Sequence, residues 1–235
     1  LFWTWAVFSR ECYSTSCGTT ENARVAASIL AIINSKLVDV GKNTILYTLY
    51  RIKNGLHHGS KHDVEKGSIF IAECYRQRLV SSQLMVQILI ELLEGQRKYV
   101  QLVISILWLV SPVLNDDDQD AFRIILSNVY KYQTDPSFSN QINNLYDWRQ
   151  NDWCRTFKGT SHKYSRIPNI FDLIEEEDQI THDKIDFDEI SPDVDKTANF
   201  VSPYDLDIAD KIHDEYKVFL EKTLDEDEEE EEVHE

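Results

Sequence analysis

The fold is decided by SSQLMVQILIELLEGQRKYVQLVISILWL, residues 81–109. Its first half places apolar side chains at the 3.6-residue spacing of one helix face, after a serine, Ser81 or Ser82, that can cap the helix. Gly95 stands where that helix would end. Residues 99–109 are apolar almost throughout, which is typical of a helix buried on most of its circumference. The stretch therefore predicts two consecutive helices, the second of which lies inside a core.

The helical pattern extends outward from this stretch over residues 22–132. The buried face predicted for the first helix consists of Val25, Ile29, Ile32 and Ile33. Gly55 predicts the end of the second helix. The acidic residues 116–118 predict a helix N-terminus, where the helix dipole favours negative charge, and a last helix is expected over residues 139–157.

These segments amount to seven helices with connections of about 2–8 residues, which are short enough to hold consecutive helices antiparallel. Successive helix pairs recur at roughly 35–40 residues, within the range of stacked two-helix repeats. We therefore predict an all-α, HEAT-like solenoid of antiparallel helix pairs. The repeats do not resemble one another in sequence, so a helix bundle remains the alternative.

Charge divides the chain into two unlike parts. Residues 171–235 hold 26 of the 41 acidic residues and only 5 of the 24 basic ones. The sequence predicts these domains: 1–21, an irregular segment or the remnant of an upstream repeat; 22–166, the partial repeat domain; 167–202, an acidic linker that docks on the body through isolated apolar residues, among them Phe171, Leu173, Ile174, Ile180 and Phe187; 203–224, an amphipathic helix; and 225–235, a disordered acidic tail. Because the chain begins with Leu1, we expect it to be a fragment of a longer protein.

The sequence contains no phosphate-binding glycine loop, no nucleophile elbow and no HExxH motif, so we predict that the chain is not an enzyme. His57, His58 and His62 are interpreted as solvated histidines of an inter-helix loop, and neither a metal nor a cofactor is assigned. The four cysteines form no regular framework, which favours free thiols in a reducing compartment. Residues 100–114 span about four helical turns and are interpreted as a buried helix, so no membrane partner is expected.

Two motifs carry a resemblance to a known family. Residues 26–36 follow the pattern AAxxxAIINSK, and residues 171–182 read FDLIEEEDQITH. The first resembles the end of a helix in the middle domain of translation initiation factor four-gamma. The second resembles the acidic segment that follows this domain in pre-mRNA-splicing factors of the nucampholin (Cwc-twenty-two) type. The resemblance covers most of residues 8–232 and is strongest at these two motifs.

The resemblance implies a non-catalytic scaffold of the spliceosome that acts in the nucleus. In that family the domain binds a DEAD-box helicase of the initiation-factor-four-A type for exon junction complex assembly. The resemblance makes Asn34 and Lys36, which end the first motif, candidate interface positions. The alternative for these two residues is a helix C-cap with a cation that complements the helix dipole. The acidic linker motif contains Glu175, Glu176, Glu177 and Asp178.

Basic residues near helix ends, among them Arg51 and Lys53, suggest a basic edge that could meet RNA or an acidic protein surface. Ordinary solvated helix ends are the alternative explanation for any one of them.

The chain departs from the family pattern in two places. The family domain begins with further helix pairs that form part of its helicase-binding surface, and these pairs have no counterpart here. Residues 137–166 diverge from the usual last repeat of the domain. The other functions left open are a translation or ribosome-assembly adaptor with the same fold and a truncated copy without retained function.

Overall fold

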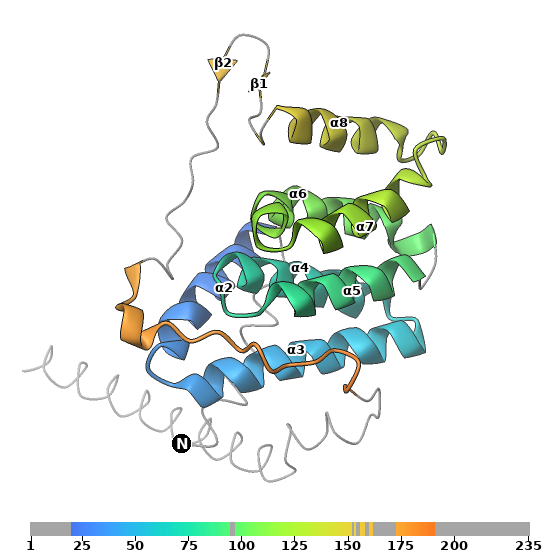
Figure 1. The fold of residues 1–235 in the computed structure, drawn as a ribbon. Helices are drawn as coiled ribbons and strands as arrows, with labels where there is room; N and C mark the ends of the chain where they lie inside the picture. Colours follow the sequence, from blue (N-terminus) through green and yellow to red (C-terminus); the bar gives the residue numbers. More distant parts are fainter. Residues whose placement is uncertain are drawn as a thin grey trace, which may run out of the picture. The chain divides into compact units, whose positions relative to one another are not determined.

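The computed structural model describes residues 20–94, 97–151, 153, 156–157, 160–161 and 173–190. Within these residues there are seven α-helices, numbered as in Figure 1: α2 (Thr20–Asn34), α3 (Val38–His58), α4 (Lys61–Arg76), α5 (Ser82–Glu94), α6 (Val100–Asp117), α7 (Gln119–Tyr130) and α8 (Ser139–Gln150). A 3-10 turn, Arg97–Tyr99, precedes α6, and two short strands, β1 (Thr156–Phe157) and β2 (Thr160–Ser161), pair antiparallel after α8. The predictions for Gly95, for nearly all of residues 1–21, and for residues 203–224 and 225–235 fall outside the described residues.

The helices stack as antiparallel pairs in two layers. One layer contains α2, α4, α6 and α8, each of which packs against the next, while α3, α5 and α7 lie in the other. Figure 1 shows the pairs one above another, from α2 and α3 through α4 and α5 to α6 and α7. The connections are short, for example two residues between α3 and α4, and such a connection reverses the chain direction. The prediction of an all-α stack of helix pairs is confirmed.

Glycines of α3 and α4 let these two helices pack closely against each other. A Cβ at Gly67 of α4 would lie 2.5 Å from Cγ1 of Ile52, so the two backbones approach closely only because the side chain is absent. Gly55 plays the same part in α3, where a Cβ would meet Val64 at 2.9 Å. The prediction that α3 ends at Gly55 was therefore wrong. The helix continues to His58, and Gly59 ends it with a φ of 79°, in the left-handed region that glycine favours.

The buried face of α2 is also a correction. Val25, Ile29 and Ile32 are exposed by 55%, 45% and 54%, although their spacing predicted a buried face. The opposite side of α2 packs against α3 and α4 instead, and its small side chains let the helices approach one another. It consists of Ala23, Ala26, Ala27, Leu30 and Ala31. Both faces of α2 are apolar, so periodicity could not show which one packs inward.

The central helix α6 packs against α4, α5, α7 and α8. By length and composition alone, Arg97–Asp117 could cross a membrane, but more than half of its most apolar window is buried inside the protein. The apolar character of α6 is therefore accounted for by its place in the core. At its outer side, Trp108 stacks on Trp148 of α8 with ring centroids 4.9 Å apart, which fastens the last helix to the stack.

Three boundaries differ from the sequence prediction. Of the acidic residues 116–118, only Asp118 caps a helix: its side chain accepts a hydrogen bond from the amide of Ala121 at the start of α7, while Asp116 and Asp117 end α6. The last helix stops at Gln150, and residues 156–157 form β1. His57 and His58 belong to the last turn of α3, and His62 to the first turn of α4.

Candidate partner-binding surface

The candidate residues of the first motif lie at the C-terminal end of α2, where the chain turns within three residues into α3. Asn34, the last residue of α2, is buried with 1% of its surface exposed. Its Nδ2 donates a hydrogen bond to the carbonyl of Ile180 at 2.8 Å. Its Oδ1 lies 2.7 Å from Nε2 of His182. Asn34 is therefore used inside the chain, to hold residues 180–182 against the helix end.

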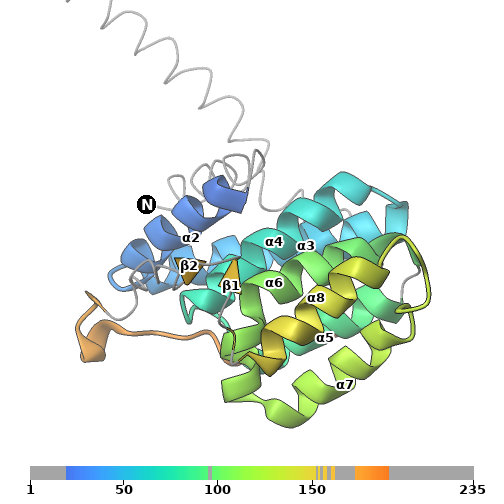
Figure 2. The same ribbon diagram turned by 90° about the horizontal axis from the view of Figure 1, so that it is seen from above.

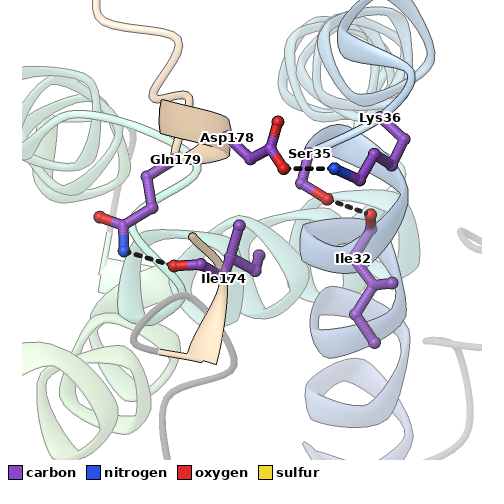
Figure 3. A network of polar contacts seen from close by, with 6 residues as sticks. All are labelled: Ile32, Ser35, Lys36, Ile174, Asp178 and Gln179. Carbon is purple, nitrogen blue, oxygen red and sulfur yellow. Dashed lines mark hydrogen bonds and ion pairs between the residues drawn. The ribbon is translucent and has the colours of Figure 1, made fainter. Parts of the chain in front are cut away.

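Lys36 lies beside the acidic motif and forms an ion pair with Asp178 (Figure 3). The hydrogen bond from Lys36 and the charge of Asp178 raise the pKa of the lysine above its ordinary value. The lysine side chain is 70% exposed, so solvent screening keeps the energy of this pair small. The carboxylates of Glu175, Glu176 and Glu177 are exposed around it on a short 3-10 turn.

Arg51 and Lys53, the candidates from the basic edge, are on α3 and pair with acidic residues of neighbouring helices. Arg51 Nη2 lies 2.7 Å from Oδ1 of Asp63 in α4. Lys53 Nζ lies 3.7 Å from Oε1 of Glu91 in α5 and 4.3 Å from the centre of the Phe187 ring. These pairs reduce the net positive potential of the edge and tie α3 to its neighbours.

Residues 173–190, here called the strap, run along the body without regular structure apart from the 3-10 turn (Figures 1 and 2). Its middle part binds the turn between α4 and α5. The hydroxyl of Thr181 donates to the carbonyl of Arg78 at 2.7 Å, and the amide of His182 donates to the carbonyl of Leu79 at 3.0 Å. Arg78 has a φ of 57°, a left-handed conformation at the helix end that helps place these carbonyls toward the strap.

The end of the strap binds α5 and α3. Gln87 of α5 contacts two neighbouring residues at once: its Nε2 donates to Oδ1 of Asp186 at 2.9 Å, and its Oε1 accepts from the amide of Phe187 at 3.1 Å. The Phe187 ring is fully buried, with the ammonium group of Lys53 over its face. Ile185 and Ile190 are buried beside it. This part of the strap is therefore held by one aromatic anchor and a bidentate amide.

Among the strap residues that the sequence singled out for docking, Phe187 is buried, Ile174 and Ile180 are half-buried, and Leu173 is exposed; Phe171 lies outside the described residues. Sequence reasoning did not find the body residues that receive the strap, Gln87 and the carbonyls of Arg78 and Leu79. No local pattern marks a glutamine in a helix as a receptor, and a backbone carbonyl is present at every position. Only the three-dimensional contact identifies them.

Gly41→Ala is expected to loosen the strap although Gly41 makes no hydrogen bond to it. A Cβ at this position would lie 2.0 Å from Oδ1 of Asn34, so the asparagine must leave its place against Ile180 and His182. We expect hydrogen exchange at the His182 amide to accelerate at least about tenfold, as a local opening that becomes easier by about 1.4 kcal/mol. In an Asn34→Ala background the same glycine change should have little further effect, and equal effects in both backgrounds would contradict the mechanism.

The docking of the strap is expected to weaken on acidification, because burial of His182 in the docked strap disfavours its charged form and lowers its pKa. Burial lowers the pKa of His182 most, and Lys42 of α3 lowers it further, while Asp183 of the strap and Asp39 of α3 act in the opposite direction. A base whose pKa is lowered on docking contributes fully above its ordinary pKa of about 6.5 and loses the contribution as pH falls below it. Protection of the strap amides should therefore decline from about pH 6.5 toward pH 5, as measured by hydrogen exchange corrected for intrinsic rates.

His182→Gln is the matched control for this titration, because a glutamine amide can still donate to Asn34 but carries no titrating group. We expect the strap of this variant to keep its protection unchanged between pH 6.5 and 5. The same pH dependence in both chains would assign the effect to another group.

The described residues contain no group of three or more His, Cys, Asp or Glu side chains that could hold a metal ion. At the strap, Lys36 is paired with Asp178, and the side chain of His182 is bonded to Asn34. What this surface offers is recognition of an extended peptide segment by buried anchors and fixed hydrogen-bonding groups.

Comparison with known proteins finds three curated relatives that carry the same name. No protein-family model matches the chain. Over 193 residues, 75% of the chain, it is 25% identical to the pre-mRNA-splicing factor CWC22 of Candida albicans, of which the match covers 30%. It is 28% identical over 166 residues to the protein of the same name from Mycosarcoma maydis, and 27% identical over 164 residues to that from Debaryomyces hansenii. These two matches each cover 67% of the chain, but 18% and 24% of the relatives.

The chain thus spans less than a third of the length of the curated relatives that it matches. The helix stack occupies residues 20–150, so a match over two thirds or more of the chain must include part of it. Over two thirds or more of its length, this chain is a relative of pre-mRNA-splicing factors of the CWC22 type.

Proposed function

We propose that this chain acts in pre-mRNA splicing as a non-catalytic scaffold in the nucleus. The observation that carries the proposal is that all three curated relatives are pre-mRNA-splicing factors. A rigid stack of helix pairs suits this role, because it offers partners an extended surface of helix ends and needs no enclosed site for a reaction.

The partners proposed are other spliceosomal proteins, among them a DEAD-box helicase of the initiation-factor-four-A type, with RNA contacts made inside the assembly. Among the candidate positions Asn34, Lys36, Arg51 and Lys53, Lys36 is the most exposed. A helicase contact at this edge would therefore go through Lys36, because Asn34 is enclosed by the strap.

The test is affinity capture with the tagged chain from nuclear and from cytosolic extracts of the same cells, with proteins identified by mass spectrometry. We expect spliceosomal proteins and the helicase to be enriched from the nuclear extract. Capture of translation factors or ribosome-assembly factors in their place would assign the chain to an adaptor of that class. Nucleolar or cytoplasmic location of the fluorescently tagged chain would point the same way.

A further inference from the structure

The surface beneath the strap is formed by four separate parts of the body. It consists of Asn34 at the end of α2, Lys53 in α3, the carbonyls of Arg78 and Leu79 between α4 and α5, and Gln87 in α5. We call these five residues the strap face. Each makes a specific contact with the strap, and together they receive a segment that has almost no secondary structure of its own.

The body's own contacts fix most of the strap face. The carbonyl groups of Arg78 and Leu79 belong to a turn whose amides are bonded back to α4, from Arg78 to Tyr75 and from Leu79 to Cys74. Lys53 is held near Glu91 by their ion pair. Gln87 lies in the middle of α5. A receptor that is ordered before its ligand arrives loses little entropy on binding, which is the condition for a preformed site.

The contacts define what this face recognises. The backbone carbonyl of residue 180 and the amides of residues 182 and 187 are bonded to it, so it reads the main chain of a peptide. The polar and ring contacts to strap side chains go to a threonine–histidine pair and to an acidic residue followed by phenylalanine, beside which Ile185 and Ile190 are buried. The ammonium group over the ring and Lys36 nearby favour an acidic ligand. A nucleic acid could satisfy the charge, but it has no main-chain amides for Leu79 and Gln87.

We propose that the strap face is an exchangeable peptide-binding site, and that its external partner is a protein segment with the chemistry of the strap, an acidic residue followed by phenylalanine. In the isolated chain the strap occupies the site as an intramolecular ligand. A tethered ligand acts at an effective concentration on the order of millimolar, so the strap excludes weak competitors and yields to a partner that binds more tightly or at several points. This inference goes beyond the scaffold role and would stand even if the chain had no part in splicing.

The test uses a fluorescein-labelled peptide of residues 178–190 and measures its anisotropy with the full chain. The receptor is the full chain with Phe187→Ala and His182→Ala, which weakens its own strap and leaves the strap face intact. We expect the peptide to bind this receptor at least tenfold more tightly than it binds the wild-type chain. Lys184→Ala, at an exposed strap position, is the matched control and should behave as wild type.

Two further measurements define the site. Gln87→Ala in the strap-weakened chain should weaken peptide binding at least tenfold, and so should Phe187→Ala in the peptide. Thr181→Val, which removes only the hydrogen bond to Arg78, provides a milder second receptor.

The proposal is overturned by a strap-weakened chain that melts like wild type but does not bind the peptide. Loss of the helical fold in both receptors would equally overturn it, because the strap would then be part of the core. Displacement of the peptide by a twelve-nucleotide single-stranded RNA would assign the face to nucleic acid and reject the peptide class.

Discussion

Arg76→Met is expected to lower the free energy of unfolding at pH 7 by an amount near the low end of about 3–5 kcal/mol, the cost of breaking a buried ion pair from one side. The partner is Glu73 of α4, whose side chain is 2% exposed. Arg76 Nη1 lies 2.9 Å from Oε2 and 3.1 Å from Oε1 of this carboxylate. Without the guanidinium the carboxylate stays buried, and among the described residues the charge of Arg24 is left to stabilise it.

The pH dependence of this variant has a defined sign. Burial raises the pKa of Glu73, against the effects of Arg76 and Arg24, and removal of Arg76 should raise it further. A carboxyl group whose pKa is raised in the folded state binds its proton more readily there than in the unfolded chain. The free energy of unfolding therefore increases as the pH falls toward the ordinary pKa of a glutamate. Urea unfolding followed by circular dichroism should therefore show a smaller difference between variant and wild type at pH 5.5 than at pH 7.

The double variant Arg76→Met with Glu73→Gln is the control. A glutamine removes the unpaired charge, so the double variant should be more stable than Arg76→Met alone and should lack the pH dependence that Glu73 causes in that variant. If the double variant were the less stable of the two, the penalty would come from lost packing of the arginine stem.

Gly67→Ala is expected to destabilise the protein by about 1–3 kcal/mol, the usual cost of overpacking a core. The sign is informative, because the same change in an exposed helix interior would be stabilising by about 1 kcal/mol. Here the new Cβ would lie 2.5 Å from Cγ1 of Ile52, a side chain with no exposed surface. The helices α3 and α4 would have to separate, and they make the most extensive contact in the stack. Chemical unfolding of the variant and of wild type measures the difference.

Ile52→Ala supplies the double-mutant test. Alone it should cost about 2–5 kcal/mol for the cavity that it leaves. Combined with Gly67→Ala it should cost less than the sum, because the methyl group of the new alanine then occupies part of the space that the isoleucine left. Strict additivity would mean that the two positions do not interact and that the close approach at Gly67 is unimportant.

Particular residues show how far sequence patterns reach in this chain. The apolar spacing around Leu84 and Ile88 predicted one buried face of α5 correctly. Polar residues four positions apart, Gln83, Gln87 and Glu91, mark the other side of this helix and leave one choice. In α2 the same rule selected Val25 and Ile29, which are exposed. Hydrophobicity favours the larger side chains, whereas close packing against α3 and α4 requires the alanines, and an isolated helix contains no information about its neighbours.

The receptor of the strap was beyond prediction for a related reason. The acidic, apolar pattern of residues 171–190 is local and can be read directly. Gln87 and the turn at Arg78 lie about one hundred residues away from their strap partners, and nothing in their own sequence surroundings distinguishes them. Contacts between segments so distant in sequence follow from how all the helices stack.

By itself the sequence determined that the chain forms helices, that these pair antiparallel, and that an acidic segment with isolated apolar residues follows them, because helical periodicity, connection length and charge are properties of neighbouring residues. The tertiary structure alone decided which face of α2 is buried, where α3 ends, and which body residues receive His182 and Phe187. The physical reason is that burial and hydrogen-bond partners are settled by the close packing of the whole stack, in which a missing Cβ at Gly67 counts as much as a large apolar side chain.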